Sequence, residues 1–103
     1  MERSEISQHE VAVYQVLKKS NNWMTNKAIA VATKAYCPVA ERTVRCHTKR
    51  FLKLGIIDLV EVFPAHVYKL SNLADKRNAA YMQRLEQALA IFNKPQTVIT
   101  DVY

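Results

Sequence analysis

The sequence predicts a mainly α-helical fold with one small β-hairpin: three helices, two strands and an extra helix at the C-terminal end. Apolar residues recur every three or four positions near 8–20, 40–54 and 75–92, which is typical of amphipathic helices. Residues 57–70 instead alternate as strands do on either side of a turn. With 103 residues, half of them apolar, the chain can bury one modest core, so we expect a single folded domain.

The first helix is expected to begin near Gln8. Ser7 and Glu10 have the spacing of a capping box, in which each side chain satisfies a backbone donor of the other residue. The apolar side consists of Val11, Val13, Tyr14, Val16 and Leu17. Ser20-Asn21-Asn22 has the turn chemistry to end the helix.

The second helix is expected from about Asn26 to Lys34, with Thr25 as its N-terminal cap. Trp23-Met24 before it resembles a short buried bridge. Pro38 disfavours a helical backbone at the preceding residue, so this helix must end before the next one begins.

The third helix, starting near residue 40, separates an apolar face from a cationic one. At about 100° per residue, Val44, Thr48 and Phe51 share a narrow face. The residues that point away from that face are Arg42, Arg45, Cys46, Lys49 and Lys53. Gly55 can adopt the left-handed conformation that ends helices, which places the end at Leu54 or Gly55. At Thr48 we expect either a smaller core or a hydroxyl bonded to the preceding turn.

A hairpin and a last helix complete the chain. The strands are expected at 57–63 and 67–70, joined by a turn at Pro64-Ala65-His66. The last helix should cover about Asp75 to Phe92, and the tail 93–103 is either disordered or an added strand. The last helix carries a long apolar stripe, which predicts dimerisation with a second copy or folding back onto its own domain. The dimerisation residues in the first case are Tyr81, Met82, Leu85, Leu89 and Phe92.

Charge favours a polyanionic partner. Fifteen Lys and Arg residues against nine Asp and Glu give a net charge of +6 and a pI near 9.5, so nucleic acid is favoured over an anionic membrane surface. The sequence has no apolar run of about 18 residues and no signal-like segment near Met1, so we expect a cytoplasmic protein. Cys37 and Cys46 are then expected to be reduced thiols.

The sequence offers little support for catalysis. Gly55 is the only glycine, which excludes a Gly-rich phosphate loop, and HExxH, CxxC and nucleophile-elbow patterns are absent. Cys37, Cys46 and His47 make a poor zinc signature because they lack paired CxxC spacing. We therefore expect no enzyme, no cofactor and no metal. Cys46 on a basic helix could sense oxidants, although a small spacer facing DNA is the favoured interpretation.

The order of elements resembles the winged helix-turn-helix family. The resemblance covers about residues 7–72 and is carried by 24–30, 42–45, 52–57 and 68–71, whose phrases are similar to those of small prokaryotic regulators of the MarR, ArsR and PadR groups. It implies a DNA-binding domain over 1–72, with the third helix in the major groove and the hairpin as a wing. Residues 73–92 would then form the dimerisation helix and 93–103 a tail.

The resemblance carries the DNA-contacting role to the third helix, where the residues concerned are Arg42, Thr43, Arg45, Cys46, Lys49 and Arg50. Arg42 and Arg45 suit guanine edges, whereas Lys49, Arg50 and Lys53 suit phosphates. On the hairpin, His66 and Lys69 are phosphate candidates. Three departures from the pattern stand out: Thr48 stands where a large aliphatic residue is usual, the wing tip has no glycine or basic residue, and the loop containing 36–38 is longer than the shortest helix-turn-helix links. Arg50 has a structural alternative to DNA contact, since it lies at a flank where it could brace the second helix.

The function expected from these observations is sequence-specific binding of double-stranded DNA by a homodimeric transcriptional regulator, a repressor in the favoured case. Two alternatives remain. One is a plasmid or phage protein for partition or replication control, and the other is a winged-helix module that binds another protein. A small-molecule effector is neither indicated nor excluded by the sequence.

Overall fold

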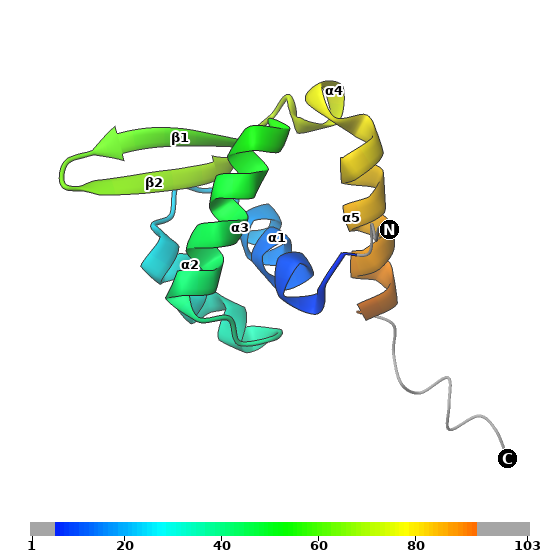
Figure 1. Ribbon diagram of the computed structural model, residues 1–103, viewed down its shortest axis with the longest axis horizontal. Coiled ribbons are helices and arrows are strands. Elements are labelled where there is room, and N and C mark those ends of the chain that lie inside the picture. Colours follow the sequence, from blue (N-terminus) through cyan, green and yellow to red (C-terminus); the bar gives the residue numbers. More distant parts are fainter. Residues whose placement is uncertain (1–5, 93–103) are drawn as a thin grey trace, which may run out of the picture.

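The computed structural model describes residues 6–92. Its elements are the helices α1 (Gln8–Ser20), α2 (Asn26–Ala32), the 3-10 turn η1 (Thr33–Ala35), α3 (Glu41–Leu54), the strands β1 (Ile57–Val62) and β2 (Ala65–Leu70), and the helices α4 (Ala74–Arg77) and α5 (Ala79–Phe92). Figure 1 shows the helices gathered around α1, with the hairpin projecting from one side and α5 on the other. This is a winged helix-turn-helix architecture, and it confirms the predicted fold class.

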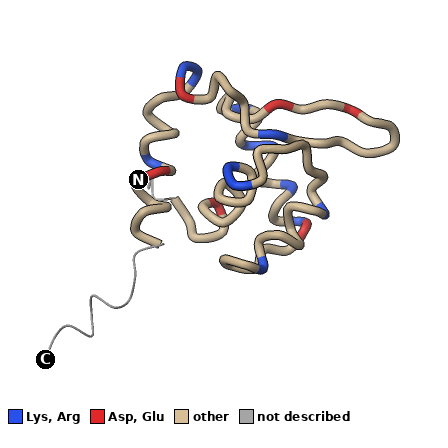
Figure 2. Tube along the Cα trace, turned by 180° about the vertical axis from the view of Figure 1, so that it is seen from behind, with Lys and Arg blue, Asp and Glu red and all other residues tan. Residues whose placement is uncertain are grey.

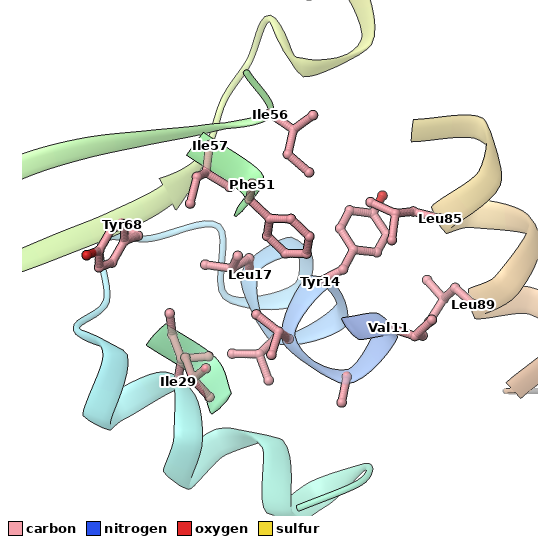
Figure 3. Packing of buried hydrophobic residues seen from close by; sticks show 14 of the residues in the cluster. Val11, Tyr14, Leu17, Ile29, Phe51, Ile56, Ile57, Tyr68, Leu85 and Leu89 are labelled. Carbon is pink, nitrogen blue, oxygen red and sulfur yellow. The ribbon is translucent and has the colours of Figure 1, made fainter. Parts of the chain in front are cut away.

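Helix α1 lies at the centre of the core, and its residues 10–17 are buried except for Gln15, which is half-buried. Val13 and Leu17 are fully buried, and they pack with Phe51 of α3 and Ile29 of α2 (Figure 3). The predicted cap forms, with the Glu10 N–H donating to the Ser7 hydroxyl at 3.1 Å. The helix ends where predicted, with Asn21 in the left-handed region at φ 47°.

Helix α2 begins as predicted, with the Thr25 hydroxyl accepting the Ala28 N–H at 3.1 Å. It ends earlier than expected, because the chain tightens into η1 at Thr33. The Thr33 hydroxyl donates to the Ala30 carbonyl at 2.6 Å and accepts the Val39 N–H at 3.0 Å. This buried threonine therefore fixes the loop that leads into α3.

The bridge before α2 exists, but only one of its residues is covered. Met24 pairs with Tyr68 of β2 through two backbone hydrogen bonds of 2.9 and 2.7 Å. Trp23 remains 40% exposed, so the prediction that both residues are buried is wrong for Trp23. The pairing fastens the base of the hairpin to the helical body.

The hairpin is tighter than the predicted one. Val62 pairs with Ala65, so only Phe63 and Pro64 lie between the paired positions, and His66 belongs to β2 instead of the turn. Before the hairpin, Gly55 ends α3 at φ 81°, as expected. The first strand residue, Ile57, is buried, whereas the outer part of the hairpin is largely exposed.

The last helix is interrupted at Asn78, which corrects the prediction of one continuous helix. Asn78 leaves the helical region with φ −153° and ψ 68°. Its amide group donates to the Leu54 carbonyl at 3.2 Å and its oxygen accepts the Tyr81 N–H at 3.3 Å. One asparagine thus caps the end of α3 and the start of α5, because its side chain offers a donor and an acceptor together.

Helix α5 packs against α1 of the same chain. Leu85 and Leu89 lie beside Val11 and Tyr14 (Figure 3), and Tyr81, Met82, Leu85 and Leu89 are all buried. At the edge of this contact the Tyr14 hydroxyl donates to Glu86, which also lies 2.7 Å from the Lys18 amine. The structure therefore gives four of the five predicted dimerisation residues an intramolecular role, and the fifth, Phe92, is exposed beside Ile91.

Two further predictions concern the C-terminal tail and membrane-spanning helices. The tail at 93–103 lies outside the described residues. Within 6–92, no helix has the length and apolarity that crossing a membrane requires.

Candidate nucleic-acid interface

The outer face of α3 is cationic and open. Arg42, Lys49 and Lys53 are exposed on the side opposite to the buried residues Val44, Thr48 and Phe51. No hydrogen bond or ion pair to another residue of 6–92 occupies Arg42. The angular separation that the sequence predicted for this helix is therefore present, and Arg42, Lys49 and Lys53 remain available to a ligand.

Thr48 joins α3 to α2. Its hydroxyl lies 3.0 Å from Asn26 Oδ1 and 3.1 Å from the Arg45 carbonyl. A hydroxyl has one proton, so it can donate to only one of these acceptors at a time. The contact with the Arg45 carbonyl, three residues earlier, confirms the predicted bond to the preceding turn. The contact with Asn26, which was not predicted, fixes α2 beneath α3.

A groove of about 560 Å³ runs between the start of α2, the exposed side of α3 and the hairpin. Arg45 and Lys49 line it from α3, Lys27 from α2, and His66 from β2. Three of the predicted site residues thus meet in one groove, although they come from separate elements. Sequence analysis missed Lys27, whose only signal was a cation in the first turn of the helix that precedes α3.

Glu41 is the one acidic residue among those that line this groove. Its carboxylate lies 3.1 Å from the Arg45 guanidinium, one helical turn away, and both side chains are substantially exposed. Such exposed pairs contribute little to stability. The pair holds Arg45 along the helix, so Arg45 must leave Glu41 before it can bind another anion, whereas Arg42 has no such partner to leave.

Arg50 lies on the other flank of α3, away from the groove. Its guanidinium is 4.0 Å from the Glu10 carboxylate of α1 and 6.0 Å from the centre of the Tyr81 ring of α5. The suggested brace therefore exists, but it reaches α1 and α5 instead of the second helix. Arg50 is part of the fold in this arrangement, and the structure does not bring it together with Arg45 and Lys49.

The two hairpin candidates differ in position. His66 lines the groove, with its ring nitrogen 3.2 Å from the Glu61 carboxylate across the strands. Lys69 is half-buried, and its amine lies 5.9 Å from the centre of the Trp23 ring. In Figure 2 the Lys and Arg segments gather on the helical body and the hairpin base, and the outer loop carries none.

The remaining α3 candidates are Thr43, which is half-buried, and Cys46, which is exposed and reduced. Cys37 is half-buried and is also a free thiol. Among the described residues, His, Cys, Asp and Glu side chains nowhere gather in a group of three that could hold a metal ion. His47, beside Cys46, is half-buried, and burial together with the charges of His9 and Arg50 lowers its pKa.

The Glu10 carboxylate behind α3 is buried in the core at 2% exposure. It accepts a hydrogen bond from the Tyr81 hydroxyl. Burial raises the pKa of Glu10, and the opposing effects of Arg50, the Ser7 backbone and Arg84 do not cancel the increase. The charged form is therefore disfavoured in the folded protein relative to the unfolded chain.

Replacing Glu10 by Gln should remove a pH dependence of stability. The pKa of Glu10 is higher in the folded state than in the unfolded chain, where it is about 4.5. The stabilising contribution of the protonated carboxyl group is therefore fully present below the unfolded-state pKa and is lost as the pH rises through the folded-state pKa. The difference in the free energy of unfolding between Glu10→Gln and the wild type should therefore shift in favour of the variant from pH 4 to pH 7. Urea denaturation at several pH values measures it. A difference that stays constant or shifts the other way would contradict the expected pKa.

Comparison with known proteins supports the fold only. No protein-family model matches the sequence, and no curated protein matches it either. Among solved structures, the chain is similar to that of a cysteine-to-serine mutant of Lactococcus lactis ZitR, with a TM-score of 0.52 and 14% sequence identity. The similarity covers 98% of this chain and 74% of the ZitR chain.

Proposed function

We propose that this protein is a transcriptional regulator that binds double-stranded DNA, with α3 in the major groove. The observation that carries the proposal is the exposed cationic face of α3, continuous with a groove that the hairpin and α2 also line. The net charge of +6 favours the same partner. The likeness to the ZitR structure concerns the fold alone.

Roles within this interface follow from the chemistry of the side chains. Arg42 and Arg45 lie in the first half of α3 and suit bidentate bonds to guanine, so they would carry specificity. Lys49 and Lys53, together with Lys27 on α2, would neutralise phosphates. Thr43 and Cys46 would make short contacts, and His66 would reach a phosphate from the hairpin. Arg50 and Lys69 receive secondary roles, because each already contacts another side chain.

We further infer that two copies act together. One recognition helix reads only a few base pairs, and such domains commonly bind two half-sites about 34 Å apart. Most of the apolar stripe of α5 is covered within the chain, so in this proposal the second copy contacts the end of α5, where Ile91 and Phe92 are exposed. A dimer placed over a promoter would act as a repressor by occlusion.

Selection of bound duplexes from a random pool tests the proposal. We expect a recovered sequence with two-fold symmetry and half-sites one helical turn apart. Binding should weaken steeply with salt, with a slope of log K against log salt of about −0.9 for each phosphate neutralised. An unselective pool would contradict sequence-specific regulation, and salt-independent binding would favour a protein-binding module instead.

A further inference from the structure

Phe63 at the tip of the hairpin is the most exposed large apolar side chain among the described residues, at 95%. Its neighbour Val62 is 55% exposed, and Pro64 follows it. Phe63 and Pro64 are the two residues between the paired strand ends, and at this exposure no described part of the chain covers the ring. Exposing a whole phenyl ring to water is unfavourable, so its position suggests a partner that covers it.

The tip lies on the same face as the cationic groove. A smaller hollow of about 200 Å³ is lined by Phe63 together with Glu61, Pro64, Ala65 and His66. The last three of these residues also line the large groove beside Arg45 and Lys49. A duplex seated on α3 would therefore pass the tip, and Figure 1 shows the hairpin projecting far enough from the body to extend along it.

Charge decides what kind of contact this tip can make. From Asp58 to Tyr68 there is no Lys or Arg, and the acidic Glu61 is paired with His66 at 3.2 Å. Without Lys or Arg, the outer hairpin has only His66 to approach a phosphate, so phosphate neutralisation, the usual source of affinity, contributes little there. An apolar side chain can instead enter the minor groove and wedge against or between base steps.

We infer that Phe63 is the principal DNA contact of this hairpin, an apolar wedge that enters the minor groove beside the major-groove site of α3. The inference rests on the proposed function. Because the contact is uncharged, it adds affinity without adding to the salt dependence, and it favours flexible pyrimidine–purine steps that unstack easily. Specificity would then come from two sources: hydrogen bonds from α3 to base edges, and the ease with which the base steps at Phe63 can be deformed.

The test uses the full chain and a duplex selected by the wild type. Phe63→Ala should weaken binding about tenfold or more, with an unchanged slope of log K against log salt. Leu73→Ala is the matched control, since it removes an exposed apolar side chain, at 46% exposure, from the segment before α4, and Leu73 lines neither the groove nor the hollow at the tip. That control should leave affinity unchanged within about twofold.

A second variant reports on the contact itself. The double variant Trp23→Phe with Phe63→Trp has its only tryptophan at the hairpin tip. The fluorescence emission of that tryptophan should be quenched when the duplex binds. Wild-type affinity in Phe63→Ala, or unquenched emission on a bound duplex, would overturn the wedge and leave the proposed function standing. Failure of the wild type to bind any duplex would overturn both. A change in oligomeric state caused by Phe63→Ala without DNA would assign the tip to a second copy and also overturn the wedge.

Discussion

Leu85→Ala is expected to lower the free energy of unfolding by about 2 to 5 kcal/mol. Leu85 is fully buried between α5 and α1, and it lies beside Tyr14 in the core (Figure 3). Removing its side chain loses apolar burial and leaves a cavity that the two helices can fill only in part. Urea denaturation of the two proteins, followed by circular dichroism, measures the loss.

The control for this substitution is Gln87→Ala, on the exposed side of the same helix. It should change stability by no more than about 0.5 kcal/mol, as is usual for surface positions. The loss in Leu85→Ala should also be independent of protein concentration, since the contact is within one chain. A loss that grows on dilution would instead show that the stripe is buried between two copies.

Arg42→Ala is expected to weaken binding to the selected duplex by about 1 to 3 kcal/mol and to weaken binding to random duplexes much less. Arg42 is exposed on α3 and has no partner to leave among the described residues, so its donors are available to a base pair. Arg45→Ala should act in the same direction. Lys49→Ala should weaken all duplexes to a similar extent, because a phosphate contact carries no sequence information. Fluorescence anisotropy with selected and scrambled duplexes measures both effects.

Arg50→Ala is the control for this series, because it removes the same side chain from the same helix. Arg50 lies near Glu10 and Tyr81 on the other flank, so its loss should affect stability more than DNA affinity. Equal losses for Arg42→Ala and Arg50→Ala, or equal losses on specific and random DNA for every variant, would contradict the assigned orientation of α3.

Local signals in the sequence predicted most of the fold. The Ser7–Glu10 capping box, the Thr25 cap and the glycine at 55 placed helix boundaries that the structure confirms. The same reasoning separated the buried and cationic faces of α3, because helical periodicity is a property of neighbouring residues. These features depend on contacts within a few positions, which are visible in the sequence.

The remaining features depend on contacts between distant residues. The hydrogen bond from Tyr81 to Glu10 spans 71 positions and the bond from Asn78 to Leu54 spans 24. Neither leaves a local pattern, so the interruption before α5 and its packing on α1 could not be derived. An apolar stripe shows that a helix face is buried but does not identify what buries it. For the same reason the sequence did not show that Lys27 would join Arg45 and Lys49 in one groove.

Asn78 has a structural consequence. Since one amide donates to the last turn of α3 and accepts from the first turn of α5, a substitution that removes it, such as Asn78→Ala, would leave a backbone group unpaired at both helix ends at once.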